Sequence, residues 1–345
     1  WSRRFRIMAI PTGAVRYNTD SNKMEVYVGS AWMEVAVSTP DLGNSDAGAR
    51  GLIMGGNSPG APNSGRLNNI EYVTITSAGN AQDFGDLTSV GRSSTGSCAS
   101  RTRGLAMGGF DESAPAYRDI IDFVTISSTG NATDFGNLTI NRQPPCSFSN
   151  ATRGCCAGGY AIAPLISPNQ NMTTIDFVTI AAEGNAVDFG DMTVAYRSRD
   201  SVQSPTRGIM VGGYSSVGNE SKVIDFVTIA TTGNAQDFGD IGSKFTSYAQ
   251  NGYGNATRGV FPLCDSNDSG NYKCDTLDFI TLSTLGNTTE YGDLTASRAI
   301  ACSFSNPTRG ILVAGASPDS DDIDYNNIAT GGTSVDFGEY SAYSK

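Results

Sequence analysis

Six acidic side chains recur at one position of a repeated sequence pattern, and carboxylates are the groups here best suited to acid–base chemistry. They are Glu71, Asp122, Asp176, Asp225, Asp278 and Asp324. Paired carboxylates carry out glycoside hydrolysis. An enzyme seldom needs the same residue six times, whereas a repeated fold does, and structural ion pairs imitate active sites. We therefore expect structural pairs or turn contacts and no catalytic residue. A carboxylate-dependent glycan-processing enzyme is an alternative.

Six arginines, each followed by glycine, recur in the same way. The Arg-Gly pairs begin at Arg50, Arg103, Arg153, Arg207, Arg258 and Arg309, at intervals of 53, 50, 54, 51 and 51 residues. A ring of guanidinium groups could bind phosphate, but its sixfold repetition again favours structural contacts. The chain has no histidine. This absence excludes Ser-His-Asp and Cys-His nucleophile systems and histidine-ligated zinc or copper.

Acidic loops and cysteines offer the remaining chemistry. Residues 265–271 and 319–324 each cluster oxygen ligands, but neither has the twelve-residue spacing and terminal glutamate of an EF-hand. We expect solvated loops and no cofactor there, with calcium as the alternative. Cys264 and Cys274 form the only plausible disulfide among seven cysteines. The first-strand cysteines are expected to be buried apolar residues, and no CxxC metal pattern occurs. They are Cys98, Cys146 and Cys302.

Short strands are the elements that must position these residues. In the copy at residues 92–139, strands are expected at 96–99, 104–107, 120–126 and 132–138. The third is rich in Ile, Val, Phe and Thr, which suit a pleated surface. Glycine and asparagine mark the turn before the fourth. A four-stranded blade cannot bury both faces alone, so six copies predict an all-β, six-bladed β-propeller.

Glycine doublets end the second strand at Gly55-Gly56, Gly108-Gly109, Gly158-Gly159 and Gly212-Gly213. Aromatic residues recur in the third strand (Tyr72, Phe123, Phe177, Phe226, Phe279, Tyr325) and in the fourth (Phe84, Phe135, Phe189, Phe238, Tyr291, Phe337). In these features the repeat resembles the kelch family of propellers. The chain departs from the family in having Phe or Tyr where kelch has a fourth-strand Trp. The doublet is also replaced by Leu263-Cys264 and by Ala314-Gly315. The resemblance implies a kelch-like propeller over residues 40–345.

Residues 1–39 do not match the repeat and are expected to form an attachment segment. Strands at 14–17, 24–28 and 32–37 would make a β-meander, which is too small to be stable alone. The segment contains Pro11-Thr12-Gly13, Arg16-Tyr17-Asn18-Thr19-Asp20, Glu25-Val26-Tyr27, Gly29 and Ala31-Trp32. In these residues it resembles a motif of tailed-phage fibre and other virion proteins.

The blades also look like propellers of marine-phage structural proteins. Together, the two resemblances imply a virion location. They imply contacts with other virion proteins through residues 1–39, with Tyr17, Tyr27 and Trp32 as the attachment residues. They also imply a homo-oligomer, for example a trimer. Tail and capsid positions both stay open.

Charge and hydropathy limit the possible partners. The net charge is −11 and the pI is near 4.5. Nucleic-acid binding is not expected, because phosphate contacts need clusters of Lys and Arg. No apolar run approaches the ~18 residues that span a bilayer, so no membrane insertion is expected.

The loops between second and third strands differ among the copies, and they should share one face of the ring. Binding usually lies on such variable loops of a rigid scaffold. Side chains expected to bind are Tyr117, Arg118, Tyr160, Tyr214, Asp268 and Tyr272. For Tyr160 and Tyr214, packing between blades is an equal possibility. The expected function is recognition of a host-surface glycan or protein without turnover. A cellular kelch-type interaction adaptor is a further alternative.

Overall fold

The computed structural model describes residues 11–18, 23–34, 50–58, 65–89, 91–111, 117–143, 145–162, 170–214, 221–242, 245–246, 252–264, 274–316 and 320–340. Contacts divide the chain into two units, Trp1–Asp41 and Leu42–Lys345. All regular structure in the described residues is β-strand. No helix with the length and apolar character of a membrane span occurs in these ranges.

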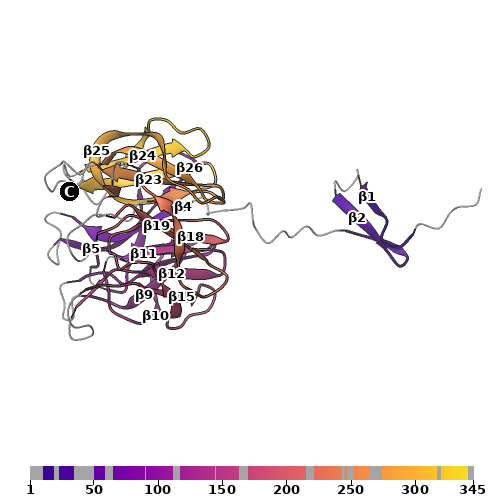
Figure 1. Ribbon diagram of the computed structural model, residues 1–345, viewed down its shortest axis with the longest axis horizontal. Coiled ribbons are helices and arrows are strands. Elements are labelled where there is room, and N and C mark those ends of the chain that lie inside the picture. Colours follow the sequence, from indigo (N-terminus) through magenta and orange to yellow (C-terminus); the bar gives the residue numbers. More distant parts are fainter. Residues whose placement is uncertain are drawn as a thin grey trace, which may run out of the picture. The chain divides into compact units, whose positions relative to one another are not determined.

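The second unit is a six-bladed, kelch-like β-propeller (Figure 1). Blade 1 contains β4 (Arg50–Asn57), β5 (Arg66–Thr74) and β6 (Gln82–Asp86). Blade 2 contains β7 (Gly96–Ala99), β8 (Arg103–Met107), β9 (Ile120–Thr125) and β10 (Thr133–Asn137). Blade 3 contains β11 (Cys146–Ser149), β12 (Arg153–Ala157), β15 (Thr174–Thr179) and β16 (Val187–Asp191). It also carries a short ladder of β13 (Tyr160–Ala161) and β14 (Gln170–Asn171).

The other three blades follow in chain order. Blade 4 contains β17 (Asp200–Gln203), β18 (Arg207–Val211), β19 (Val223–Thr228) and β20 (Gln236–Asp240). In blade 5, β21 (Phe245–Thr246) and β22 (Tyr253–Gly254) pair with β23 (Arg258–Cys264), followed by β24 (Cys274–Thr281) and β25 (Thr289–Ser305). The long strand β25 continues into blade 6 as its first strand. There it pairs with β26 (Arg309–Ala316), followed by β27 (Ser320–Asn327) and β28 (Val335–Glu339).

The first strands of neighbouring blades lie against one another, as β7 does with β11 and β11 with β17, so they surround the ring axis. The turns between first and second strands share an edge with those between third and fourth strands. The loops between second and third strands share the opposite edge with the connections between blades. This opposite edge is called the loop face below.

Each blade is fixed to the next by its Arg-Gly arginine. The Nη1 group donates to a carbonyl oxygen of the following blade in the pairs Arg50–Ile126 (3.1 Å), Arg103–Ile180 (3.1 Å), Arg153–Ile229 (3.0 Å), Arg207–Leu282 (3.0 Å), Arg258–Ile328 (3.2 Å) and Arg309–Ile75 (3.3 Å). Each guanidinium also lies over the third-strand aromatic ring of its own blade, 4.5 to 4.9 Å from the centroid. The repeated arginines are therefore structural, as the sequence predicts.

The glycine of the Arg-Gly pair is required by packing between blades. A Cβ atom at Gly208 would lie 2.1 Å from the ring of Phe148 in the preceding blade. A Cβ atom at Gly310 would lie 1.9 Å from the Tyr253 ring, and one at Gly51 would lie 1.9 Å from the Phe304 ring. A first-strand side chain thus fills the space that a second-strand side chain would need.

The ring closes between blade 6 and blade 1 by the contacts used at every other junction. The Gly79 and Ala81 amides donate to the carbonyl oxygens of Phe337 (2.9 Å) and Glu339 (3.0 Å). An apolar cluster that includes Ile53, Ile311 and Phe337 fills this junction. The described strands of blade 6 all come from the C-terminal end of the chain. This confirms that closure needs no N-terminal strand in the last blade; residues 35–49 lie outside the described residues.

The first unit contains one antiparallel sheet of β1 (Val15–Asn18), β2 (Lys23–Val28) and β3 (Ala31–Glu34). The strands expected at 14–17 and 24–28 differ from β1 and β2 by one residue at their ends. The third begins one residue earlier than expected, and residues 35–37 lie outside the described ranges. The two faces of this sheet differ in chemistry.

Candidate binding surface

The repeated aspartates form buried ion pairs in the blades where their arginine partners are described. Buried arginines from the connections between blades pair with them: Arg92–Asp122 (2.9 Å), Arg142–Asp176, Arg199–Asp225 (2.6 Å) and Arg298–Asp324 (2.8 Å). A threonine hydroxyl donates to each of these carboxylates as well: Thr88, Thr139, Thr193 and Thr295. In blade 5, the hydroxyl of Thr288 donates to Asp278 (2.6 Å). These carboxylates hold the connections between blades.

Reasoning from sequence missed these four arginines. They follow their threonines by 4, 3, 6 and 3 residues, because the connection between blades varies in length. These arginines therefore do not recur at a fixed spacing in the repeat. Burial lowers the pKa of Arg92, although Asp122 and Asp111 oppose that shift.

The glycine doublets aim three aromatic residues onto the loop face. Gly108 and Gly109 have φ values of 63° and 104°, which only glycine adopts easily. The chain then turns so that Phe110 pairs with Ser93 of the preceding connection, with N–O distances of 2.8 and 3.0 Å. Tyr160 pairs with Gln143 in the same way, and Tyr214 with Arg197. Each aromatic residue is therefore fixed through its backbone.

These rings continue into a row of contacts that crosses four blades. Arg66 of blade 1 lies 4.3 Å over the Phe110 ring, and Phe110 meets Tyr117 at 5.7 Å. Tyr117 meets Tyr160 of blade 3 at 6.3 Å. Arg197 lies 4.8 Å from the Tyr160 ring and 5.4 Å from Tyr214 of blade 4. All six side chains are half-buried. We call this set, Arg66, Phe110, Tyr117, Tyr160, Arg197 and Tyr214, the aromatic row.

Three of the residues expected to bind ligand, Tyr117, Tyr160 and Tyr214, are brought together in this row. Arg118 is engaged differently, because its guanidinium forms two hydrogen bonds with Asp111, at 2.6 and 2.9 Å. That pair joins Asp111 and Arg118, which lie on either side of residues 112–116. The expected residues Asp268 and Tyr272 lie outside the described residues.

Phe110, Arg66 and Arg197 are members of the row that sequence reasoning missed. Phe110 had a signal, because it follows a glycine doublet as Tyr160 and Tyr214 do. No sequence signal marks the two arginines, since the rings that they contact are distant in sequence and come close only in the folded chain.

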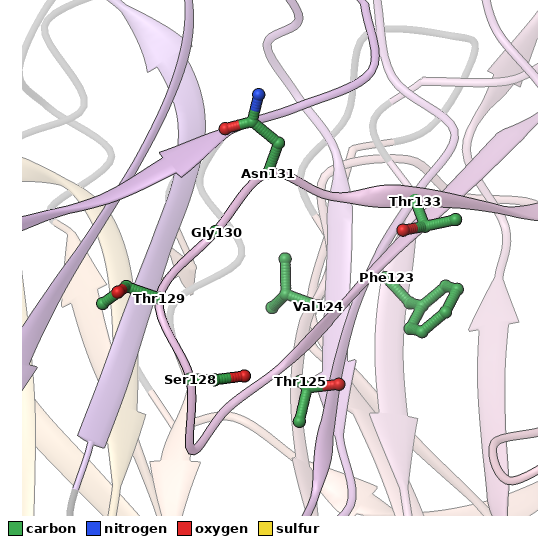
Figure 2. A pocket seen from close by; sticks show the side chains of 8 residues that line it. All are labelled: Phe123, Val124, Thr125, Ser128, Thr129, Gly130, Asn131 and Thr133. Carbon is green, nitrogen blue, oxygen red and sulfur yellow. The ribbon is translucent and has the colours of Figure 1, made fainter.

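The opposite edge of the ring carries a small hollow. A hollow of about 120 Å³ lies inside the turn between β9 and β10, lined by Ser128, Thr129 and Gly130 among others. Figure 2 shows the Asn131 carboxamide pointing out of this hollow, and its oxygen accepts from the Asp86 amide of blade 1 at 3.1 Å. The turn therefore joins two blades through its asparagine side chain, a role that the sequence does not predict.

The free cysteines that the structure describes supply no reactive group to the loop face. Cys98, Cys146, Cys155 and Cys156 are free and buried, and Cys302 is free and half-buried. Burial raises the pKa of Cys155 and of Cys156 to about 12, so these thiols stay protonated and unreactive at neutral pH. Cys274 is disulfide-bonded, and Cys264 stands opposite it in the register of β23 and β24. Over the described ranges, no cluster of three or more Cys, Asp or Glu residues could hold a metal ion.

The small sheet of the first unit has one polar and one apolar face. On the polar face, Arg16 pairs with Glu25 at 2.7 Å and lies 4.2 Å over the Trp32 ring, which also meets Tyr27 at 5.4 Å. On the apolar face, Val15, Tyr17, Val28 and Met33 are 53 to 58% exposed. Of the expected attachment residues, Tyr17 therefore lies on the exposed apolar face. Tyr27 and the half-buried Trp32 lie on the other.

Comparison with known proteins supports the fold. No family model matches the chain, and no curated protein is similar to it in sequence. Among solved structures, that of YjhT is similar with a TM-score of 0.58 and 8% sequence identity, over 73% of this chain and 86% of YjhT. At this identity the similarity shows the fold alone. In all, 337 solved chains match, so the fold is common and does not select a function.

Proposed function

We propose that this chain is a non-enzymatic structural and binding protein of a tailed-phage virion, whose propeller recognises a glycan or protein on the host surface. The observation that carries the binding function is the aromatic row on the loop face. Its rings and guanidinium groups are half-buried and held by backbone pairing, and rigid aromatic residues with arginine are typical anchors of interfaces.

The burial and ion pairing of the repeated carboxylates support a binding function rather than catalytic turnover. An acid or base in catalysis must reach the substrate. Asp122, Asp176, Asp225 and Asp324 are instead buried, each against its own arginine. The alternative of a glycan-processing enzyme finds no support from them.

The virion part of the proposal rests on the sequence resemblance of residues 11–32 to phage fibre motifs. The apolar face of the first unit fits an attachment role, because isolated soluble domains rarely leave such a face uncovered. Val15, Tyr17 and Met33 would contact other virion proteins or further copies of the chain. A kelch-type cellular adaptor would use the same loop face but would have no need of this segment.

Binding of fluorescently labelled protein to bacterial cells tests the proposal, with strains chosen as hosts of phages that encode similar propellers. We expect Tyr117→Ala and Tyr160→Ala to reduce cell binding at least tenfold, since each removes a ring from the middle of the row. Thr129→Ala, an exposed change on the opposite edge, is the matched control and should bind as the parent chain does. Melting temperatures of all variants should remain close together.

Two results would contradict the binding function. One is equal cell binding by the Tyr117, Tyr160 and Thr129 variants. The other is release of modified glycan by the parent protein. Labelling of intact particles with antibody against the propeller tests the virion location, and absence of label from purified virions would overturn it.

A further inference from the structure

Arg197 differs from the other arginines that the structure describes. The Arg-Gly arginines donate to carbonyl oxygens, four buried arginines pair with aspartates, and Arg118 pairs with Asp111. Arg16, Arg66 and Arg101 also have polar or ring partners. The Arg197 guanidinium contacts only the rings of Tyr160 and Tyr214 among the described residues. Its five N–H donors have no acceptor from the described chain.

The surroundings of Arg197 hold this group in place. Its backbone pairs with Tyr214 through hydrogen bonds of 3.2 and 2.9 Å. The Asn171 side chain donates to the Tyr214 carbonyl oxygen at 2.7 Å, which fixes the second ring. A guanidinium that lies over aromatic faces keeps its donors free at its edges, because the cation–π contact uses the face of the ring. The result is a half-buried, oriented cation with unused donors.

We propose that Arg197 binds the carboxylate of an acidic sugar, so that the ligand of the aromatic row is a uronic-acid polysaccharide; this rests on the proposed function. The planar guanidinium fork matches a planar carboxylate in two parallel hydrogen bonds. The neighbouring Tyr160 and Tyr117 present amphipathic rings that pack against the apolar face of a pyranose while their hydroxyls meet its polar edge.

The net charge of the chain favours a ligand that is recognised by a local contact rather than by a broad positively charged surface. At a net charge of −11, the protein as a whole repels every polyanion, the proposed polymer included, so an anionic polymer must be held by local contacts; a nucleic acid, which needs many phosphate contacts, is disfavoured. One oriented cation beside stacked rings suits a polymer that carries a carboxylate on each sugar. Binding should accordingly depend less on salt than the binding of a polycationic surface does.

Affinity electrophoresis in native gels tests this proposal. The full-length protein is run through gels containing polygalacturonate or alginate, and through gels containing their fully methyl-esterified forms, which keep the sugar rings and lose the charge. We expect retardation by at least one acid polymer, and at least tenfold weaker binding of its ester. Arg197→Met, which keeps the length of the side chain between the rings, should weaken binding to the acid polymer at least tenfold. Arg197→Lys should bind less tightly than the parent, since it keeps the charge but loses the fork.

Arg101→Met is the control, because it removes one positive charge from an exposed turn on the opposite edge; its binding should equal that of the parent. Equal retardation by acid and ester forms, equal affinity of Arg197→Met and the parent, or no retardation by either acid polymer would overturn the proposal. A single-stranded oligonucleotide that retards the parent instead would overturn it too. If Tyr117→Ala loses cell binding while Arg197→Met keeps it, only this inference fails. If neither variant differs from the parent on cells, the proposed function fails as well.

Discussion

At the scale of single residues, the surroundings of each guanidinium decide what an arginine does in this chain. Arg142 is fully buried and pairs with a fully buried aspartate, Asp176. Arg153 is half-buried between an aromatic ring and a neighbouring carbonyl oxygen. Arg197 lies between rings that cannot neutralise it. The same side chain therefore fills a core, joins two blades or, at Arg197, keeps donors without an acceptor among the described residues.

The buried pairs give a prediction about stability. Asp176→Ala would leave the Arg142 guanidinium buried without its carboxylate, and we expect the free energy of unfolding to fall by about 3–5 kcal/mol. The double variant Asp176→Ala/Arg142→Met should lose clearly less, because no uncompensated charge remains. Chemical denaturation of the two variants and the parent measures both values. A double variant as unstable as the single one would show that packing, rather than the buried charge, dominates.

Individual residues also show where sequence reasoning succeeds and where it fails. The structural role of the repeated acids and arginines was predictable, because sixfold repetition belongs to architecture. The partners of the acids were not, since Arg92 and Arg199 come from connections of different length. The role of Arg118 was also not predictable, because nothing in the sequence shows that its guanidinium faces Asp111.

At the scale of elements, the second strand of each blade is built to receive its neighbour. Its arginine reaches forward to the next blade, and its glycine accepts a side chain from the preceding one. Phe148, Tyr253 and Phe304 fill such positions. One dipeptide therefore serves two junctions, which explains why arginine and glycine stay adjacent in all six copies.

Substituting alanine for these glycines should destabilise the protein most where the neighbouring side chain cannot move aside. In Gly208→Ala the new Cβ would lie 2.1 Å from the Phe148 ring, a buried group that cannot move aside. We expect a loss of about 1–3 kcal/mol, the usual cost of overpacking a core. Gly104→Ala is the matched control, because the closest contacts of its Cβ would be the ends of the Leu52 and Met54 side chains, at 3.0 and 3.2 Å. Thermal unfolding should rank Gly208→Ala below Gly104→Ala, and the reverse order would contradict this account of the motif.

The strands were predictable from the sequence, whereas the aromatic row was not. Third strands and turns carry local signals in residue type and in glycine position. The contact between Tyr117 and Tyr160 joins residues of two blades, and periodicity does not show which side chains of neighbouring loops meet. Sequence could therefore identify the face that carries the row but not the row itself.

At the scale of the whole molecule, the buried hydrophobic residues of the described chain all lie in the second unit, and the two units have separate expected tasks. Removing residues 1–41 should leave a folded propeller, because the described junction contacts of blades 1 and 6 all lie within the second unit. We expect a melting temperature within a few degrees of the parent, and loss of oligomers that form through the apolar face of the first unit. Calorimetry and light scattering measure the two effects. A truncated chain that unfolds, or that assembles as the parent does, would contradict the assignment.

The contact of Arg309 with Ile75 makes the last junction equivalent to the other five. In an open array of repeats, the outermost units have one unpaired side and unfold first. Here every blade has two partners, so no blade is outermost and none needs a special cap. Fraying has no preferred starting point, and loss of any one blade exposes two apolar junctions at once. The ring should accordingly persist or unfold as a single cooperative body.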